Sequence, residues 1–422
     1  MKILMTVFQM LDYGGIVQYT ENLAKGFVEQ GHKVSVVLLR NSDLDPRERQ
    51  ADTIVEGNYK STIANRAHAA NGWYGIWIYS YGSKRQRRIW RKYAEKFDLV
   101  IHQIPVPEAD KYGHWRKLYD IETPQILVSH DAHFPLRYPH LIDIADRIVG
   151  IAAVNPASLA SLAEFPAPRC MIGSPHVPLD WDESAPWNHR AFQFASAHVW
   201  KPWKHMDTVL RTIPYTRRLK VFNWIGGDGI EGRYMRSVDK CKPQYEGIWQ
   251  RALKYGMDYH GMISPRKILK AYGNSRVMVD LSYSRSFAQY GNHVNRSTLE
   301  AYNAGCIPLV TRENMKELTK PHLFRKDFTH IEVPHDIKPK ALAEIIRDTA
   351  AMSRPTADEI VAAGRALLMK HWDYRVVAEH FMELAKLKKK AGIYRSLIHG
   401  ELTPEMQARR DKYMARIHRR KS

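Results

Sequence analysis

The chain has 422 residues, of which 44% are hydrophobic, so it is long enough for two or three domains with ordinary cores. This composition excludes disorder as a description of the whole chain. Lys and Arg number 64 against 44 Asp and Glu, which gives a formal charge of +20. Such an excess favours a polyanionic partner, either nucleic acid or an acidic membrane surface, and leaves the fold open.

The cysteines and the apolar runs bear on the compartment. Cys170, Cys241 and Cys306 lie far apart, without the close spacing of a metal or redox motif, and this indicates a reducing compartment. The first fifteen residues are interrupted by polar residues and glycines, which does not fit a secretory signal, and no run of 18 apolar residues occurs. We therefore expect a soluble, cytoplasmic protein without integral membrane association.

The first forty residues predict a strand, a helix and a second strand in succession. An apolar run over 3–10 leads through a turn over 12–15 into a stretch with helical spacing over 16–30. Gly31 ends that helix, and an apolar strand follows over 34–39. Two further apolar runs, over 99–104 and 126–129, alternate with helix-like stretches. This pattern is typical of a buried parallel sheet covered on both faces.

Residues 169–190 interrupt the alternation, because they contain three prolines and no periodicity, and they predict an interdomain connection. The alternation then restarts, with strands over 192–197, 220–225, 276–281 and 307–310 and helices over 205–213, 245–256 and 297–304. The sequence thus predicts an α/β fold of two Rossmann-like doubly wound domains. We place the domains at 1–175 and 190–370, a helix that packs back on the first domain at about 373–390, and a basic tail at 395–422.

Gly14 and Gly15 lie between the first strand and the first helix. A Gly-rich turn lets backbone N–H groups approach an anionic group at the helix N-terminus. The spacing is not that of a dinucleotide fingerprint, since no further glycine follows until Gly26. A plain tight turn explains the pair equally well.

His130 and Asp131 directly follow the apolar strand over 126–129. Open α/β sheets bind ligands at the carboxyl ends of their strands, so both side chains are placed for proton transfer or substrate orientation. An ordinary polar junction between strand and loop is an equal alternative. We discount a metal at His130 and His133, because this loop offers at most three ligands without a fixed face.

Lys201 and Lys204 lie in the first loop of the second domain, just before a predicted helix. Lysines at the start of a helix can pair with phosphates while backbone amides bind the same group. Taken alone, a solvated basic loop is the simpler explanation.

The segment 290–305 predicts a second anion site. Asn295 or Ser297 can cap a short helix that Gly305 ends, so the amides before it can bind an anion. Glu300 lies one or two turns inside this helix among apolar neighbours, and its carboxylate suits the two vicinal hydroxyls of a ribose. Because a buried Glu without a partner is costly, we favour a functional role for it.

A basic run over 84–92 contains Trp90 and directly follows an aromatic segment. A solvated face is the default for one run, but several runs and the net charge favour a phosphate-backbone footprint. The neighbouring aromatics suit an unstacked base and equally suit a lipid interface. The cations of this run are Lys84, Arg85, Arg87, Arg88, Arg91 and Lys92.

The order of these motifs resembles that of the retaining, nucleotide-sugar-dependent glycosyltransferases of GT-B fold. The likeness spans nearly the whole chain. It rests on Gly14-Gly15, GHKVSVV from Gly31, the His130 loop, Lys204, IGGDG from Ile225, YHGMIS from Tyr259 and STLEAYNAGCIPLV from Ser297. Within that family the chain resembles the bacteriophage enzymes that glucosylate DNA, by His130-Asp131-Ala132-His133, Trp203-Lys204 and Leu299-Glu300 leading to Gly305.

The resemblance implies a nucleotide-sugar co-substrate, a UDP-sugar, bound in the cleft between domains without a metal or other cofactor. It places Lys204 at the diphosphate, Glu300 at the ribose, and His130 and Asp131 at the sugar and the acceptor. Gly14 and Gly15 would face the diphosphate from the first domain. The loop that would hold sugar and phosphate comprises Asn292, His293, Val294 and Asn295.

Two positions depart from the family pattern. The family usually has an Arg five residues before the Lys, where this chain has Val199, and Lys201 is the candidate substitute. The family often has a Glu eight residues before the ribose Glu, where this chain has Asn292. Both departures concern the identity of the sugar.

Three functions follow as hypotheses. The leading one is a retaining, metal-independent glycosyltransferase that acts on the hydroxyl of a modified base, such as a hydroxymethylated pyrimidine, in double-stranded phage DNA. It would be a monomer in the host cytoplasm. The main rival is a peripheral-membrane enzyme of the same fold with a lipid or polysaccharide acceptor. The third is a non-catalytic DNA-binding protein with a decayed sugar site.

Overall fold

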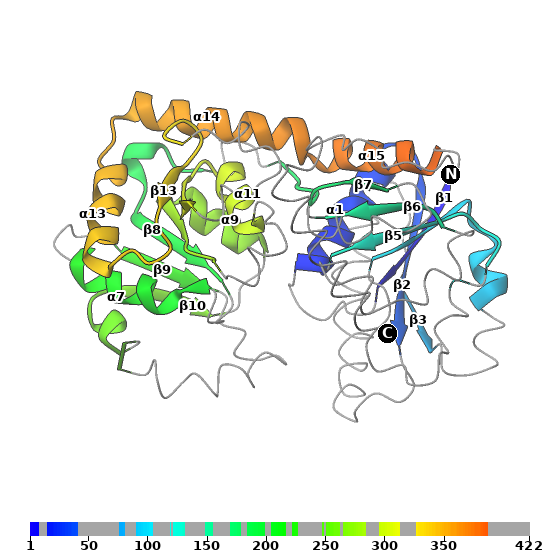
Figure 1. Ribbon diagram of the computed structural model, residues 1–422, viewed down its shortest axis with the longest axis horizontal. Helices are drawn as coiled ribbons and strands as arrows, with labels where there is room; N and C mark the ends of the chain where they lie inside the picture. Colours follow the sequence, from blue (N-terminus) through cyan, green and yellow to red (C-terminus); the bar gives the residue numbers. More distant parts are fainter. Residues whose placement is uncertain are drawn as a thin grey trace, which may run out of the picture. The chain divides into compact units, whose positions relative to one another are not determined.

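A computed structural model describes just over half of the chain. The described residues are 1–7, 15–40, 76–80, 90–103, 119, 121–130, 148–154, 169–178, 184–198, 204–216, 222–226, 247–248, 250–261, 265–283, 295–312 and 326–386. They form two compact units, one of residues 1–177 together with 371–422 and the other of residues 178–370 (Figure 1). We refer to them as unit 1 and unit 2. In the described part of the chain, no helix is long and apolar enough to cross a membrane.

Unit 1 is built on a parallel sheet of seven strands in the order β3-β2-β1-β4-β5-β6-β7. Every residue of β4 and β5 is buried, as a sheet covered on both faces requires. The strands are β1 (Lys2–Val7), β2 (Lys33–Arg40), β3 (Ile76–Ser80), β4 (Leu99–His102), β5 (Gln125–Ser129), β6 (Ile148–Ala153) and β7 (Arg169–Met171).

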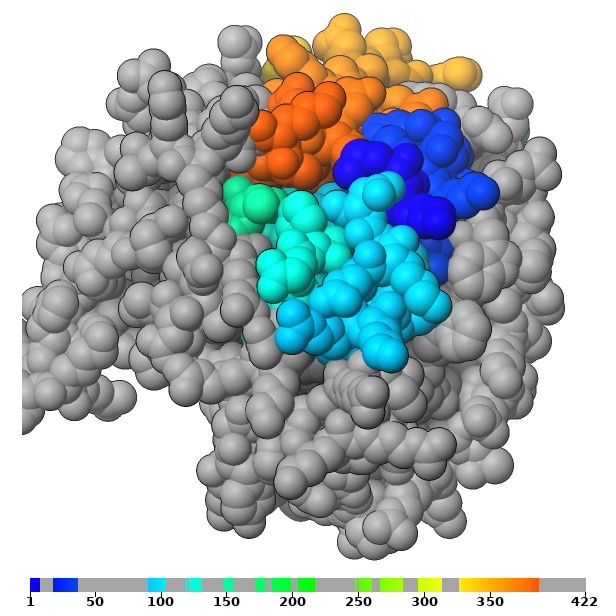
Figure 2. Space-filling view, turned by 90° about the vertical axis from the view of Figure 1, so that its right-hand side faces the viewer, coloured from blue at the N-terminus to red at the C-terminus, as the bar shows by residue number. Residues whose placement is uncertain are grey.

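Two helices from opposite ends of the chain close one core of unit 1. Helix α1 (Gly15–Glu29) buries Tyr19, Leu23 and Phe27, which recur every four residues on one face. Helix α15 (Tyr374–Lys386) packs against α1 and β6 through Phe381 and its neighbours, and Figure 2 shows it in orange beside the blue N-terminal segment. A Cβ at Gly26 would lie 2.4 Å from the Tyr374 carbonyl oxygen, so only glycine allows this approach.

The segments on either side of unit 2 are joined within unit 1. The His176 N–H donates to the Trp372 carbonyl at 2.7 Å, and the Tyr374 N–H donates to the His176 carbonyl at 2.9 Å. The carboxylate of Asp373 is buried and accepts from the Arg375 backbone N–H at 2.8 Å, which caps α15. The chain therefore leaves unit 1 beside the place where it returns.

Unit 2 repeats the architecture with six parallel strands in the order β10-β9-β8-β11-β12-β13. Counted along each unit, the six strands of this sheet and the first six of the other have the order 3-2-1-4-5-6 of a Rossmann-type sheet, and β7 adds a seventh strand in unit 1. The strands are β8 (Phe192–Ala197), β9 (Phe222–Gly226), β10 (Met257–Gly261), β11 (Ser275–Asp280), β12 (Ile307–Thr311) and β13 (Ile331–Val333).

Helices cover both faces of the second sheet, and the strand pleat assigns side chains to each. Phe194 and Val279 belong to a core with α7 (Met206–Thr216) and α13 (Pro339–Ala350). Their neighbours Ala195 and Met278 belong to the opposite core, with α9 (Pro265–Gly273) and α11 (Arg296–Asn303) (Figure 1). The described part of unit 2 also contains the 3-10 helix η5 (Trp187–His189), helical residues within 247–254, and α14 (Arg354–His371).

The predicted α/β fold of two Rossmann-like doubly wound domains is confirmed. The stretch 169–190 was predicted as a connection, but its first residues form β7 at the edge of the first sheet, because Cys170 and Ile172 are apolar and fully buried there. Trp90 was grouped with the aromatics that suit a base, whereas its side chain is only 1% exposed and belongs to a core. The predicted tail over 395–422 lies outside the described residues.

Candidate functional site

The carboxyl edge of the second sheet gathers polar side chains where the strand order reverses. The first strand of unit 2, β8, lies between β9 and β11, so the connections after β8 and β11 leave in opposite directions. Open α/β sheets bind their ligands at this point. His198 and Lys204 follow β8, Asp280 ends β11, and α11 begins shortly after β11 along the chain.

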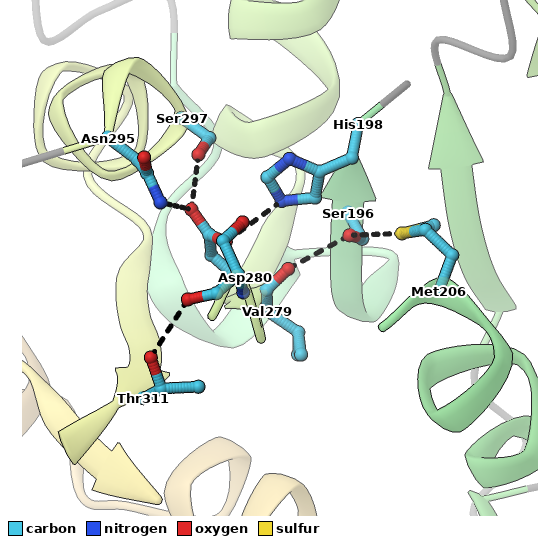
Figure 3. Close-up of polar contacts among 9 residues, drawn as sticks. Ser196, His198, Met206, Val279, Asp280, Asn295, Ser297 and Thr311 are labelled. Atoms are coloured by element: carbon cyan, nitrogen blue, oxygen red, sulfur yellow. Dashed lines mark hydrogen bonds and ion pairs between the residues drawn. The ribbon is translucent and has the colours of Figure 1, made fainter. Parts of the chain in front are cut away.

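Asp280 is the centre of this arrangement (Figure 3). Its side chain is buried, and Oδ2 accepts hydrogen bonds from Asn295 Nδ2 at 2.9 Å and Ser297 Oγ at 2.7 Å. Its other oxygen, Oδ1, accepts from the Ser282 N–H at 2.9 Å and from the Ser282 hydroxyl. A buried carboxylate with this many donors stays ionised, because hydrogen bonds to the charged form offset the loss of water.

Two cationic or potentially cationic groups face the same carboxylate. His198 Nε2 lies 3.5 Å from Asp280 Oδ1. Burial alone would raise the pKa of Asp280, but His198, Lys204 and the hydroxyl hydrogen bonds hold that pKa below its usual range. Burial lowers the pKa of His198 to about 4, with Asp280 opposing this shift and Lys204 adding to it. His198 is therefore neutral at neutral pH, and Lys204 is the cation near Asp280.

The loop that carries Lys204 is held in a restricted conformation. His205 has a positive φ of 48°, which is uncommon for a residue other than glycine. Its Nε2 lies 3.2 Å from the Tyr283 carbonyl oxygen, to which a protonated Nε2 donates. This contact joins the loop after β8 to the loop after β11, and it fixes the backbone next to Lys204.

Helix α11 presents its first turn to this edge. Asn295 is at the N-cap position, but its side chain donates to Asp280 and makes no capping bond to the helix amides. The sequence predicted that Asn295 or Ser297 would cap α11, and the structure shows both side chains bound to Asp280 instead. The first-turn amides are thereby oriented by a buried anchor, with the positive end of the helix dipole at the edge.

Glu300 lies inside α11 and is buried, 6% exposed. Its Oε1 accepts from Arg296 Nε at 2.9 Å, one helical turn earlier. Burial raises the pKa of Glu300, and Arg296 opposes this shift. The predicted ribose ligand is thus a carboxylate with one oxygen bound by an arginine of the same helix.

Unit 1 has polar groups at the corresponding edge. His130 follows β5, and its Nε2 lies 3.3 Å from Gln103 Oε1, just beyond the end of β4. The ring of Tyr19 from α1 packs edge-on against His130, with 4.8 Å between ring centroids. Burial, with a smaller contribution from Cys170, raises the pKa of Tyr19 well above its ordinary value, so its hydroxyl keeps its proton.

A buried hydrogen-bond chain lies within the strands that lead to this edge. Thr6 Oγ1 is 2.8 Å from His102 Nδ1, and His102 Nε2 is 3.0 Å from Gln125 Oε1. Because the amide oxygen of Gln125 only accepts, His102 carries its proton on Nε2 and accepts from Thr6 through Nδ1. Burial lowers the pKa of His102 to about 4, so this chain is uncharged at neutral pH.

The predicted site residues fall into three groups. Lys204, Asn295 and Glu300 lie in the loop after β8 and in or beside α11, His130 is at the edge of the first sheet, and Gly15 begins α1. Asp280 and His198 were missed; a polar residue at the end of each of two buried strands was the available signal. The remaining predicted residues lie outside the described ones: Gly14, Lys84, Arg85, Arg87, Arg88, Asp131, Lys201, Asn292, His293 and Val294.

Arg91 and Lys92 belong to a helical turn over 90–94 that precedes β4. The Arg91 guanidinium lies 2.9 Å from Glu95 and 3.6 Å from Glu122, and Glu122 comes just before β5. This pairing places Arg91 toward the amino ends of the strands, whereas His130 is at their carboxyl ends. Lys92 is exposed.

A metal site is not apparent in the part of the chain that the structure describes. There, His, Cys, Asp and Glu form no group of three or more that could hold a metal ion.

Sequence comparison with known proteins matches only part of the chain to a family. The sequence profile of Glycosyltransferase Family 4 matches residues 13–169. No curated protein matches the chain in a sequence comparison.

Solved structures match over almost the whole chain. HepE of Anabaena in complex with UDP-glucose has a TM-score of 0.61 at 14% identity, covering 92% of this chain and 100% of that one. An alpha-glucosyltransferase in complex with UDP and a 13-mer DNA containing an HMU base has a TM-score of 0.65 at 13% identity, with the same coverage. A glycosyltransferase from Rickettsia africae has a TM-score of 0.60 at 14% identity, covering 91% and 97%.

These likenesses concern the fold, since the identities are low. Together with the two parallel sheets, whose first six strands have the same order, they show that the chain has the GT-B glycosyltransferase fold.

Proposed function

We propose that the protein is a glycosyltransferase that uses a UDP-sugar, with its donor site at the carboxyl edge of the second sheet. The observation that carries this proposal is the meeting of Lys204 and the first turn of α11 around the buried Asp280. A lysine beside a helix N-terminus is suited to a diphosphate. The fold likeness to structures that contain UDP-glucose or UDP supports the choice of donor.

Each donor residue has a separate role in this proposal. Lys204, assisted by Lys201, neutralises the charge that develops on the departing diphosphate, which lowers the barrier without a metal. Glu300 accepts hydrogen bonds from the ribose hydroxyls through the oxygen that Arg296 does not bind at 2.9 Å. The segment of Asn292, His293, Val294 and Asn295 holds sugar and phosphate, and Gly14 and Gly15 complete the diphosphate site.

His130 and Asp131 act at the acceptor in the same proposal. The acceptor hydroxyl loses its proton, its oxygen bonds to the anomeric carbon, and the bond from that carbon to the diphosphate breaks and releases UDP. His130, oriented by Gln103 at 3.3 Å, and Asp131 position the hydroxyl and assist its deprotonation. The resemblance to retaining enzymes suggests that the anomeric configuration is kept.

We further propose that the acceptor is the hydroxyl of a modified base, such as a hydroxymethylated pyrimidine, in double-stranded DNA. The net charge of +20 and the cations Lys84, Arg85, Arg87, Arg88, Arg91 and Lys92 suit a phosphate backbone. The complex of the similar alpha-glucosyltransferase with DNA containing an HMU base supports this choice over a lipid acceptor.

The test is a transfer assay with mass analysis of the nucleosides. The full-length protein is incubated with a panel of UDP-sugars and with duplex DNA that carries hydroxymethylated or unmodified pyrimidines. A mass gain of one sugar on the modified base alone is expected. Release of UDP without a mass gain on any nucleoside would reject the proposed DNA acceptor. If the protein neither binds UDP nor releases it from any UDP-sugar, the proposal of a glycosyltransferase is rejected.

A further inference from the structure

We infer that Asp280 is a positioning residue, whose buried carboxylate holds the first turn of α11 in the geometry that binds the diphosphate of the donor. The inference rests on the proposed function, because it assumes a donor site at this edge. Asp280 is 1% exposed, so its carboxylate is not accessible to a ligand. It acts through the segments that it joins.

The carboxylate joins two segments through opposite oxygens (Figure 3). Oδ2 binds the start of α11, at Asn295 and Ser297, with distances of 2.9 and 2.7 Å. Oδ1 binds Ser282, whose N–H is 2.9 Å away, in the loop after β11. One rigid group therefore sets the position of α11 relative to the end of its own sheet.

The surroundings of Asp280 are fixed in turn by neighbouring strands. The Thr311 hydroxyl donates to the Ser282 carbonyl at 3.1 Å, which ties the loop after β11 to β12. The Ser196 hydroxyl donates to the Val279 carbonyl at 2.9 Å, which ties β11 to β8. An anchor that cannot move is what a preorganised anion site requires.

The charge of Asp280 has the wrong sign for a phosphate site, and this makes its role testable. A negative charge close to Lys204 weakens the attraction of that lysine for a diphosphate, so a purely coulombic effect predicts tighter UDP binding when the charge is removed. Loss of positioning predicts weaker binding, because an amide at this place cannot accept from both Ser282 and the start of α11. The two effects have opposite directions.

The experiment measures the dissociation constant of UDP by titration calorimetry for the full chain and for Asp280→Asn, with thermal unfolding of each. We expect UDP binding to weaken at least tenfold in Asp280→Asn. Binding that is unchanged or tighter would overturn the inference. If the unaltered protein does not bind UDP, the proposed function fails, and the two failures are thereby distinguished.

Two further variants separate positioning from loss of stability. Ser275→Ala removes a buried hydrogen bond, 2.8 Å from Ser275 Oγ to the Ala271 carbonyl, at the opposite end of the same strand. It should lower thermal stability and leave UDP binding unchanged. Ser297→Ala keeps the carboxylate and removes one of its bonds to α11, with a residue that favours helix. If Asp280→Asn does not fold, Ser297→Ala decides. A loss of UDP affinity of threefold or more supports the inference, and an unchanged UDP affinity refutes it.

Discussion

The two units have the same strand order and different side chains at the point where that order reverses. In the described part of unit 2, this edge carries the ionised Asp280 with Lys204 nearby, and Glu300 lies in the adjoining helix. In the described part of unit 1, the corresponding edge has the uncharged amide of Gln103 beside His130, and the buried His102 at the end of β4 is neutral. The fold supplies the place, and the side chains decide which ligand it can bind. The positive charge of Lys204 suits a diphosphate, and neutral dipoles suit a hydroxyl.

The largest expected effect is on the rate of sugar transfer, when Lys204 at the carboxyl edge of the second sheet is removed. Lys204→Ala should lower the rate of sugar transfer about 100-fold, which is the order of loss for one donor that stabilises a developing anion. The measurement is the initial rate at saturating acceptor over a series of UDP-sugar concentrations. Lys267→Ala, which removes an exposed lysine of α9, is the matched control and should leave the rate unchanged. Equal rates in both variants would contradict the donor-site assignment.

The second-largest expected effect is a loss of folding stability in both units as pH falls. Burial lowers the pKa of both His102 and His198 from 6.5 to about 4. The unfolded chain then binds protons first as pH falls from 6.5 toward 4, so each histidine removes up to about 3 kcal/mol of stability over that window. The lowered pKa of Asp280 adds a loss that continues below its unfolded value of 3.8, in unit 2.

Urea unfolding between pH 7 and pH 4 measures this dependence. His102→Gln removes one titrating group from unit 1, so its stability deficit relative to the unaltered protein should shrink as pH falls. Parallel stability curves for the two proteins would show that His102 is not a buried neutral histidine.

A smaller effect is expected at two glycines where helices pack closely, one in each unit. At Gly26 a Cβ would lie 2.4 Å from a backbone oxygen of Tyr374, and at Gly364 it would lie 2.2 Å from the Tyr302 ring. Overpacking of this kind costs about 1–3 kcal/mol. Gly26→Ala should be the more destabilising change, because a ring can shift more easily than a helix backbone.

The control for this pair is Gly247→Ala, whose Cβ would meet nothing within 4 Å. It should be neutral or stabilise by up to about 1 kcal/mol through helix propensity. The three variants are compared by the free energy of unfolding in urea. If Gly364→Ala costs more than Gly26→Ala, the argument from backbone rigidity is wrong.

The smallest effect concerns the cations of unit 1. Lys92→Ala should reduce the slope of log affinity for DNA against log salt by about 1, as expected when one phosphate contact is lost. Arg91→Ala should change the slope less, because its guanidinium already lies 2.9 Å from Glu95 and 3.6 Å from Glu122. The slopes come from fluorescence anisotropy with a short duplex at several salt concentrations. A larger change for Arg91→Ala than for Lys92→Ala would show that Arg91 contacts DNA in spite of its pairing with Glu95 and Glu122.

Sequence patterns predicted the bounds of the strands with long apolar runs almost to the residue. A parallel strand that is buried on both faces is a continuous apolar run, and its ends are visible in the sequence. The run 192–197 coincides with β8, and the run 276–281 differs from β11 by one residue at each end. Helices α13 and α14 were not predicted, although the spacing of Leu342, Ile346 and Ala350 in α13 is helical.

Asp280 shows why the site was predicted only in part. A single Asp at the end of an apolar run looks like the beginning of a solvent-exposed loop. Its burial depends on Asn295 and Ser297, 15 and 17 residues later, and on His198, which follows β8. Local periodicity carries no signal for such contacts, so only the tertiary structure reveals the residue.

The join between His176 and the Trp372–Tyr374 segment has a consequence for synthesis on the ribosome. Unit 2 is one continuous stretch of the chain, so it can fold as soon as it emerges. Unit 1 is split, since the core under α1 also needs Val377, Phe381 and Leu384 from α15. The part of the apolar face of α1 that α15 covers is therefore made early and stays uncovered until nearly the whole of this chain is translated.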